Sequence, residues 1–319
     1  MGFPVVRYEE NQTSNWGVIK GDNVIPVSGT FDSLAAFLKN GVDKARQIAV
    51  SDIDTGISIN NLQILSPITR PAQIVCQGLN YSSHRAEAGS SEKPTFNLIF
   101  SKADSSLCGP NDHVIRPEHV ELLDYEIELG LVIKTEITHS IEVTENNLFD
   151  YVAGLVIAND VSARDIQIPQ DLFKGKSYRT FCPVGPYLYI LDRDDIPRIS
   201  NLELKLWVNE ELRQSANTKQ LIYKPTETIT ELSGLMNLSP GDLIMTGTPG
   251  GVAVQLSGEL IQKMSEFPEK KAEIFRDNQK DNVHYLKDGD RVRSEIKSAD
   301  GLIDLGVQEN LIVGNSSNQ

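Results

Sequence analysis

Two glutamates separated by a single residue, Glu126 and Glu128, are the side chains whose spacing most directly suggests chemistry. Apolar residues alternate with them along the chain, namely Tyr125, Ile127, Leu129, Leu131 and Ile133. This period of two predicts a strand over residues 126–133, with apolar side chains on one face and both carboxylates on the other, about 6.6 Å apart. Neighbouring carboxylates repel each other unless water or a cation separates them. The pair is therefore either a solvated polar face or part of a cation site.

A third carboxylate, Asp160, follows the apolar run from Tyr151 to Ala158. The run predicts a buried strand that delivers an acidic side chain at its end. Residues 162–165 then have the spacing of a capping box, which predicts a short helix with Arg164 and Gln167 on one face. Taken alone, Asp160 is as consistent with a turn or a helix cap as with a functional role.

His84 and Glu87 lie three residues apart in a segment where Ser82 or Ser83 could cap a helical turn. On such a turn the carboxylate lies beside the imidazole, where it would fix the tautomer and raise the basicity that a general base needs. Surface ion pairs have the same spacing, so the sequence leaves both interpretations open. The polar residues 89–94 that follow have the composition of a mobile segment, so we expect this turn to act as a lid.

The chain of 319 residues carries 30 Lys and Arg against 44 Asp and Glu, a net charge of −14. This balance argues against nucleic acid or an anionic membrane as a partner, because both attract basic faces. Three scattered cysteines without a C-x-x-C pair predict reduced, buried thiols at Cys76, Cys108 and Cys182. The sequence contains no phosphate loop, serine elbow or H-E-x-x-H motif. Its N-terminus lacks a signal-peptide pattern, so we place the protein in the cytoplasm.

The elements that must position these residues divide into two predicted units. Residues 1–69 form a small α+β unit, with a hairpin around residues 21–23 and a short helix that ends at Gly41. Residues 70–319 carry the best strand patterns, at 73–77, 126–133, 151–158, 187–191, 202–208 and 290–313. Within them, residues 253–285 change to a charged helical pattern with Pro268 at a helix start. The mixture predicts a β-rich α+β fold and not a doubly wound sheet.

Six segments taken together resemble the fumarylacetoacetate hydrolase superfamily. They lie in residues 70–251 and 286–313 and read RPAQIVCQGLNYSSHRAE, DYEIELGLVI, NDVSARDIQ, GKSYRTFCPVGP, LSPGDLIMTGTPGG and LKDGDRVRSEI. The resemblance implies a mixed β-sandwich roll as the catalytic domain, a small N-terminal domain before it, and a homodimer. It also implies a divalent metal on Glu126, Glu128 and Asp160. Residues 253–285 are longer than the loop expected of compact members, which makes them a helical insertion.

Three carboxylates without His or Cys favour a hard cation such as Mg²⁺ or Mn²⁺, with Ca²⁺ as a further candidate. Such a cation leaves positions for the oxygens of a 2-oxo acid and would stabilise the enolate or oxyanion that forms. The resemblance implies further roles. Lys176 matches the family's active-site lysine, Arg164 and Gln167 match positions that contact substrate, and Thr248 matches a position that contacts a carboxylate. A dication together with Arg164 and Lys176 would supply the local positive potential that an acidic protein needs to bind an anion.

The resemblance therefore implies a small 2-oxo or 2,4-dioxo acid as the substrate. Our leading prediction is metal-dependent hydrolysis of a C–C bond in a 2,4-dioxo acid of the acylpyruvate or fumarylpyruvate type, by a water that His84 deprotonates while Glu87 orients it. One alternative keeps the site but decarboxylates, tautomerises, isomerises or hydrates a dicarboxylic 2-oxo acid, of the oxaloacetate or 2-oxohept-3-enedioate type. Another alternative is a non-catalytic homologue stabilised by its metal. The upstream metal-binding aspartate of fumarylacetoacetate-cleaving enzymes has no clear counterpart here, which argues against that substrate.

Overall fold

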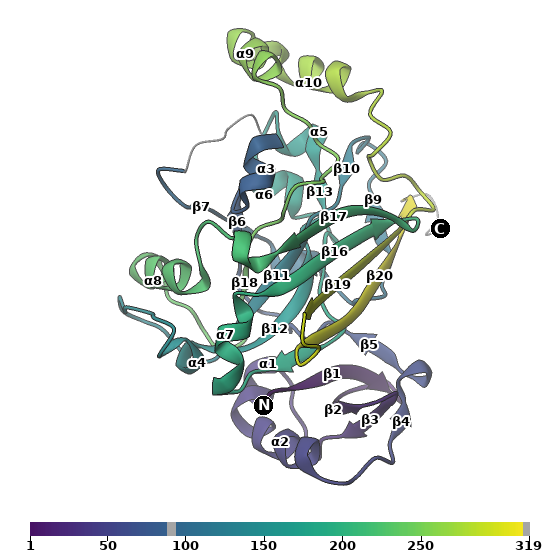
Figure 1. The fold of residues 1–319 in the computed structure, drawn as a ribbon. Coiled ribbons are helices and arrows are strands. Elements are labelled where there is room, and N and C mark those ends of the chain that lie inside the picture. Colours follow the sequence, from purple (N-terminus) through teal and green to yellow (C-terminus); the bar gives the residue numbers. More distant parts are fainter. Residues whose placement is uncertain (88–93, 315–319) are drawn as a thin grey trace.

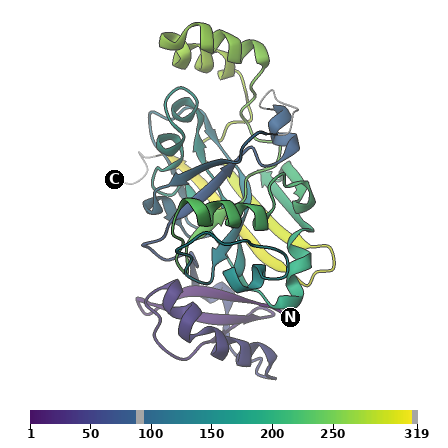
Figure 2. The same cartoon turned by 90° about the vertical axis from the view of Figure 1, so that its left-hand side faces the viewer.

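The computed structural model describes residues 1–87 and 94–314. Residues 89–93 of the polar segment expected to be mobile therefore lie outside the described residues. Two β-sheets form the body of the molecule, with the N-terminal unit at one end and α9 (Gly258–Glu266) and α10 (Lys271–Gln279) at the other (Figure 1, Figure 2). None of the helices in these ranges combines the length and the apolar character that crossing a bilayer would require.

The larger sheet runs through both predicted units, and eleven strands of the described residues belong to it. Its order is β4-β3-β2-β1-β15-β12-β11-β18-β6-β7, with β5 beside β1. These strands are β1 (Phe3–Glu10), β2 (Thr13–Lys20), β3 (Asn23–Pro26), β4 (Ile57–Ser58), β5 (Gln63–Leu65), β6 (Ile74–Gly78), β7 (Leu98–Lys102), β11 (Ile127–Ile133), β12 (Val152–Asn159), β15 (Leu188–Ile190) and β18 (Leu243–Met245). β1 pairs with β15, so the sheet continues across the predicted boundary at residue 69. The division into two domains stays a prediction.

The smaller sheet has the order β17-β16-β19-β20-β9. Its strands are β9 (Val114–Arg116), β16 (Leu202–Val208), β17 (Glu211–Asn217), β19 (Arg291–Ser298) and β20 (Asp304–Gly314). Two short pairs complete the strands: β10 (Leu123–Asp124) with β13 (Ser162–Ala163), and β8 (Leu107–Cys108) with β14 (Cys182–Pro183). Both large sheets mix antiparallel pairs with a parallel one, β6 with β18 and β9 with β20. The predicted β-rich α+β class is confirmed.

Short helices connect the strands. They are α1 (Leu34–Asn40), α2 (Val42–Val50), α3 (Ser82–Glu87), α4 (Leu148–Tyr151), α5 (Arg164–Gln167), α6 (Leu172–Lys176), α7 (Ile196–Ile199) and α8 (Pro225–Leu235), with 3₁₀ turns η1 (Ile59–Asn61), η2 (Asp104–Ser106), η3 (Arg193–Asp195), η4 (Thr218–Gln220) and η5 (Pro268–Lys270). α1 starts after Ser33, whose hydroxyl accepts the Ala36 N–H, and ends at Gly41 as predicted. The helical pattern of residues 253–285 is also confirmed, because α9, η5 and α10 project there as a helical arm (Figure 1, Figure 2).

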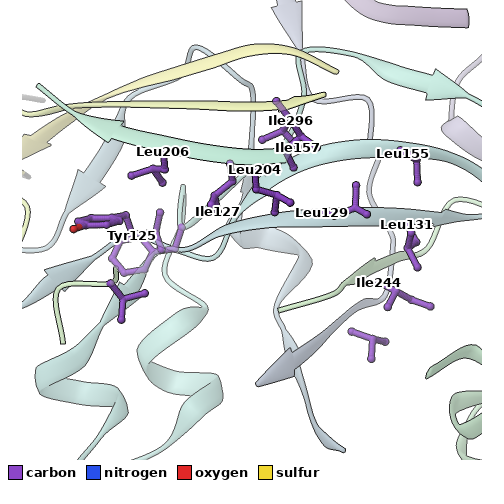
Figure 3. Packing of buried hydrophobic residues seen from close by; sticks show 14 of the residues in the cluster. Tyr125, Ile127, Leu129, Leu131, Leu155, Ile157, Leu204, Leu206, Ile244 and Ile296 are labelled. Atoms are coloured by element: carbon purple, nitrogen blue, oxygen red, sulfur yellow. The ribbon is translucent and has the colours of Figure 1, made fainter. Parts of the chain in front are cut away.

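The main core lies between the two sheets, and it explains the alternating pattern of β11. Ile127 and Leu129 lie on the side of Leu204 and Ile296 of the smaller sheet, and Leu131 lies beside Ile244 of β18 (Figure 3). All of these side chains are fully buried. The opposite face of β11 is buried as well, because Val132 belongs to a second core with residues of β6, β18 and the N-terminal unit. The carboxylates of the alternating pattern therefore face protein and not solvent. Buried charges are costly, so these carboxylates need partners inside the protein.

The predicted capping box at residues 162–165 is wrong. Ser162 lies in β13 and pairs with Asp124, and its hydroxyl donates to the Asp160 carbonyl. α5 begins only at Arg164, and Ala163 precedes it without a side-chain cap. The carboxylate of Asp165 accepts the Glu121 N–H instead. Because Ser162 pairs with Asp124 in a strand, its backbone is not available to start a helix, as the capping box would have required.

The second core supplies a stability prediction. Phe37 is fully buried and stacks on Trp16 with 4.2 Å between ring centroids. We expect Phe37→Ala to lower the free energy of unfolding by about 3–5 kcal/mol in a denaturant titration, because it leaves a cavity. Because β1 and β15 belong to one sheet, we expect the protein to unfold in a single transition, and Phe37→Ala should shift this whole transition to lower denaturant concentration. Phe267→Ala, at a half-exposed ring, should change the midpoint little. A separate early transition, which alone shifts in Phe37→Ala, would contradict this expectation.

Candidate active site and metal centre

Adjacent strands bring the three carboxylates together. β11 and β12 are antiparallel neighbours with Ile127 opposite Asn159, so Glu126 precedes one strand where Asp160 follows the other. The Asp160 N–H donates to the Glu126 carbonyl at 2.9 Å. One carboxylate oxygen from each of Glu126, Glu128 and Asp160 lies within 4.8 Å of the others. All three are buried, with Glu126 4% and Asp160 0% exposed, which excludes the solvated polar face as an interpretation.

Burial and mutual repulsion act differently on the two glutamates. Burial, together with the charges of Asp160 and Glu126, raises the pKa of Glu128 well above its usual value. Burial also opposes ionisation of Glu126, but the charges of Lys176 and Arg164 outweigh it and hold the pKa of Glu126 at about 2. Basic side chains of the protein thus neutralise Glu126, whereas Glu128 is left without enough positive charge nearby.

Three basic side chains surround the cluster. Lys176 Nζ donates to Glu126 Oε2 at 3.0 Å and to Asp160 Oδ2. Burial disfavours the charge of Lys176, but the charges of Asp160 and Glu126 outweigh that effect and raise its pKa, so it stays an ammonium. Arg164 donates from Nη2 to Glu126 Oε1 at 2.5 Å and from Nε to Asp124 Oδ2 at 2.8 Å. Lys102 Nζ donates to the other oxygen of the same carboxylate, Asp160 Oδ1.

The residues present fit a divalent cation. Glu128 Oε2 accepts the Gly247 N–H at 2.7 Å, whereas Oε1 is buried and has no hydrogen-bond partner among the described residues. A buried carboxylate oxygen without a partner is costly unless something else satisfies it. Three oxygen donors without nitrogen or sulfur match the preference of Mg²⁺, Mn²⁺ or Ca²⁺. Among the described residues this is the one group of three or more His, Cys, Asp and Glu side chains that comes together in this way. The three cysteines are free and buried, as predicted.

A small cavity opens beside the cluster. Its volume is about 180 Å³, and it reaches His84, Glu87, Glu126, Arg164, Gln167, Lys176 and Thr248. The volume lies below the roughly 300–1,000 Å³ of pockets for larger ligands. The structure therefore brings the predicted catalytic and substrate-binding residues to one cavity together with Glu126, and the size of the cavity suits a small acid.

His84 and Glu87 share one side of α3, as the spacing predicts. His84 Nδ1 lies 3.5 Å from Glu87 Oε2, which is within ion-pair reach but longer than a hydrogen bond. Glu87 Oε1 accepts the Gly251 N–H at 2.7 Å, so the glycine turn fixes the carboxylate. His84 is only 8% exposed, which argues against a surface ion pair.

The predicted substrate-contacting residues are already bonded to protein. Arg164 Nη1 donates to Gln167 Oε1 at 2.7 Å, so all three of its nitrogens have protein acceptors. The Thr248 hydroxyl donates to the Ile127 carbonyl and accepts from the Gln214 side chain, both at 2.9 Å. These bonds hold Arg164, Gln167 and Thr248 rigidly at the cavity wall.

Sequence reasoning missed two buried charged residues. Lys102 continues the alternation of Leu98 and Phe100, which line the cavity, and this period of two was the available signal. Its ammonium also donates to the Phe181 carbonyl at 2.8 Å. Asp124 precedes the two glutamates in the same alternating pattern. It accepts from Arg164 and from the N–H groups of Ala253 and Val254, so it ties Arg164 to the base of the helical arm.

One cavity residue has an unusual backbone. Leu79 has φ of +54°, a left-handed conformation that costs an L-residue roughly 1–2 kcal/mol. The side chain of the next residue holds the turn in place, because Asn80 Nδ2 donates to the carbonyls of Thr246 and Tyr223 and its Oδ1 accepts the Tyr223 N–H. Such strain is found where the surrounding structure enforces it, often at a binding site.

Comparison with known proteins agrees with this arrangement. A family model described as the C-terminal part of fumarylacetoacetate (FAA) hydrolase matches residues 73–313. The fumarylacetoacetate hydrolase domain-containing protein 2 homolog of Dictyostelium discoideum is 33% identical over 309 residues, which is 92% of each chain. The mitochondrial oxaloacetate tautomerase Fahd2a of Rattus norvegicus is 36% identical over 244 residues, 73% of this chain and 75% of its own.

A solved structure shows the same fold. The fumarylacetoacetate hydrolase of the psychrophilic Exiguobacterium antarcticum superposes with a TM-score of 0.74 and 29% identity, over 98% of this chain and 100% of its own. The family model covers the carboxylate cluster, the basic side chains around it and all the lining residues of the cavity. This chain is an enzyme of the fumarylacetoacetate hydrolase superfamily.

Proposed function

We propose that this enzyme catalyses the enol–keto tautomerisation of a small 2-oxo acid with the help of a divalent cation, and that oxaloacetate is the first substrate to test. One observation carries the proposal: three buried carboxylates form a cluster with Lys176, and Glu126 and Lys176 of this cluster line a cavity of about 180 Å³. The name of the rat relative, an oxaloacetate tautomerase, favours this reaction over others of the superfamily.

Glu126, Glu128 and Asp160 would hold Mg²⁺ or Mn²⁺ through the carboxylate oxygens that face one another. A bound dication supplies Lewis-acid stabilisation of negative charge on a substrate oxygen. Four buried carboxylates, the cluster and Asp124, lie near three basic side chains, Arg164, Lys102 and Lys176. With all of them ionised, a dication would change a local excess of negative charge into an excess of positive charge, which attracts an acid anion.

The chain's own residues would do the rest. Lys176 is an ammonium at the cavity wall, so its N–H groups can donate to an enolate oxygen of the substrate. Tautomerisation moves a proton between that oxygen and the carbon next to the one that bears it, with the C=C double bond becoming C=O, and needs no attacking water. Arg164 and Gln167 are held at the wall by mutual hydrogen bonds, which would orient the substrate without reorganisation.

C–C hydrolysis of a 2,4-dioxo acid is the second candidate, and the pair of His84 and Glu87 favours it. The imidazole lies in the cavity wall beside a carboxylate that Gly251 fixes. It could deprotonate a water that attacks the carbonyl remote from the acid head. A cytoplasmic location and a homodimer stay predictions. The mitochondrial name of the rat relative makes the location worth testing directly.

The proposed cation site predicts opposite effects of one substitution. Glu128→Gln keeps an acceptor for the Gly247 N–H and removes a carboxylate that its neighbours repel. We expect the metal-free variant to unfold no earlier than the wild type, while its affinity for Mn²⁺ in calorimetry falls at least about 100-fold. The rise in Tm that Mn²⁺ gives the wild type should disappear. Glu142→Gln, at an exposed position, should keep both properties. Wild-type affinity in Glu128→Gln would rule out this site.

Substitution of His84 separates the two candidate reactions. His84→Ala should lower the rate of pyruvate release from an acylpyruvate by about 10²–10⁴-fold, the usual contribution of a general base. Much of the rate of oxaloacetate tautomerisation, followed by the loss of enol absorbance, should remain. Equal losses in both assays would contradict this division, provided that the variant binds metal normally.

Lys176 should matter for both reactions. Lys176→Met removes the ammonium but keeps much of the apolar stem, so we expect kcat to fall by about 10²–10³-fold. Lys174→Met is a matched control, because Lys174 lies on the same short helix and is exposed, and its side chain donates only to Gln170 among the described residues. Turnover is compared at saturating metal. An unchanged kcat in Lys176→Met would remove this residue from the mechanism.

A further inference from the structure

A second cavity lies where the N-terminal unit meets the body of the molecule (Figure 1). Its volume is about 450 Å³, within the roughly 300–1,000 Å³ of pockets that bind small molecules. Residues of α1 and α2 form one part of its lining, and most of the remainder comes from the segment after β11, from α4, and from β12 and β15.

This cavity is separate from the active site. β11 and β12 carry the carboxylate cluster at one end, where Glu126 precedes β11 and Asp160 follows β12. The second cavity is at the other end of the same two strands, because Lys134 follows β11 and Ala153 lies near the start of β12. A ligand in it would therefore not reach the cluster.

The lining of the second cavity combines apolar and basic side chains. Its apolar members include Leu38, Val42, Phe149 and Ile190. Within the part of the chain that the structure describes, three basic residues line it, Lys39, Arg46 and Lys134, against one acidic residue, Glu136. In a chain with a net charge of −14, this is a local excess of positive charge. Such an excess attracts anions.

Lys134 is the half-buried ammonium of this lining, and its contacts are with uncharged groups. Its Nζ donates to the Phe149 carbonyl at 3.0 Å and lies 3.7 Å from the centre of the Phe149 ring. It makes no ion pair within residues 1–87 and 94–314. Burial lowers the pKa of Lys134, and the positive charges of Arg193 and Arg46 add to this effect.

The acidic side chains that act on Lys134 are already paired with other cations. Asp150 Oδ1 lies 3.1 Å from Arg193 Nη2, and Asp192 Oδ2 lies 2.8 Å from Arg46 Nη1. Asp192 also lies 3.5 Å from the N-terminal amine. An anion in the cavity would therefore supply the negative charge that the surroundings of Lys134 lack.

We propose that the second cavity binds a carboxylic acid with a compact apolar body, of the aryl carboxylate type, whose carboxylate is bound by Lys134. The apolar side chains of the lining favour a hydrocarbon body, and the Phe149 ring offers an aromatic surface to an aryl group. The excess of positive charge disfavours a metal ion or a cationic ligand. Because the site is separate from the carboxylate cluster, this proposal does not depend on the proposed function.

Calorimetry on the full chain with 2-naphthoate and with its uncharged counterpart 2-naphthamide tests the site. We expect the acid to bind at least about tenfold more tightly than the amide, because only the acid forms a charge-assisted hydrogen bond with Lys134. Its affinity should be the same with saturating Mg²⁺ and with EDTA. The acid should also raise the Tm, since it would contact both the N-terminal unit and the strands behind it.

Lys134→Met removes the ammonium and keeps much of the apolar stem. Affinity for 2-naphthoate should fall about tenfold and affinity for 2-naphthamide less than twofold. Lys44→Met is the matched control. Lys44 Nζ also donates to a backbone carbonyl, that of Ser28 at 3.0 Å, and lies 5.9 Å from the centre of the Phe31 ring, but Lys44 does not line the cavity. It should leave both affinities unchanged.

Ala35→Trp tests the position of the site independently of charge. Ala35 lines the cavity from α1, so an indole at this position occupies the space of the apolar body. Both 2-naphthoate and 2-naphthamide should then bind at least about tenfold more weakly, while the affinity of the active site for Mn²⁺ stays that of the wild type.

Equal affinities of the wild type for the acid and the amide would overturn the proposal, as would the absence of saturable binding. Binding of 2-naphthoate only in the presence of Mg²⁺ would place the acid at the carboxylate cluster and reject the second site. Unchanged 2-naphthoate binding in Lys134→Met or in Ala35→Trp would do the same. Oxaloacetate turnover is measured on the same preparations, so that failure of the proposed function and failure of this site are recorded separately.

Discussion

Repulsion among three buried carboxylates is the constraint on which the rest of this structure depends. Two unit charges 4.8 Å apart repel by roughly 3–4 kcal/mol at an effective dielectric constant of about 20, and Glu126, Glu128 and Asp160 lie within that distance. The protein meets this cost with cations and with backbone N–H groups. α5 delivers Arg164, α6 delivers Lys176, and the turn after β18 directs the Gly247 N–H at Glu128. One oxygen of Glu128 remains without a partner among the described residues, and there a cation would complete the cluster.

Such a cluster needs a rigid support, and the sandwich behind it provides one. Antiparallel pairing of β11 and β12 fixes the separation of Glu126 and Asp160, because a slip by one residue would turn both carboxylates into the apolar core. Ile127 and Leu129, which alternate with the carboxylates, lie against the smaller sheet (Figure 3). The same alternation therefore builds the core on one side of the strand and the site on the other.

The cavity lies beside this cluster, and the base of the helical arm contributes Val254 to its wall. Asp124 connects Arg164 to Ala253 and Val254, while Gly251 fixes Glu87. In the proposed function the cluster and its basic neighbours would hold the acid head of the substrate and stabilise negative charge on it.

The sequence alone determined several strands, among them β6, β11, β12 and β16, together with the alternation of β11, the three carboxylates and the resemblance that joins them, because these depend on local period and on motif order. Burial was decided only by tertiary structure. From spacing alone, Glu126 and Glu128 could have formed a solvated face, and His84 and Glu87 a surface ion pair. The partners Lys102 and Asp124 could not be assigned, since the bond between Lys102 and Asp160 joins residues 58 positions apart. Ser162 had a helix-capping pattern, but its pairing with Asp124 placed it in a strand. Local pattern specifies which face of an element is apolar, whereas the charge and strain of a site depend on contacts between distant segments.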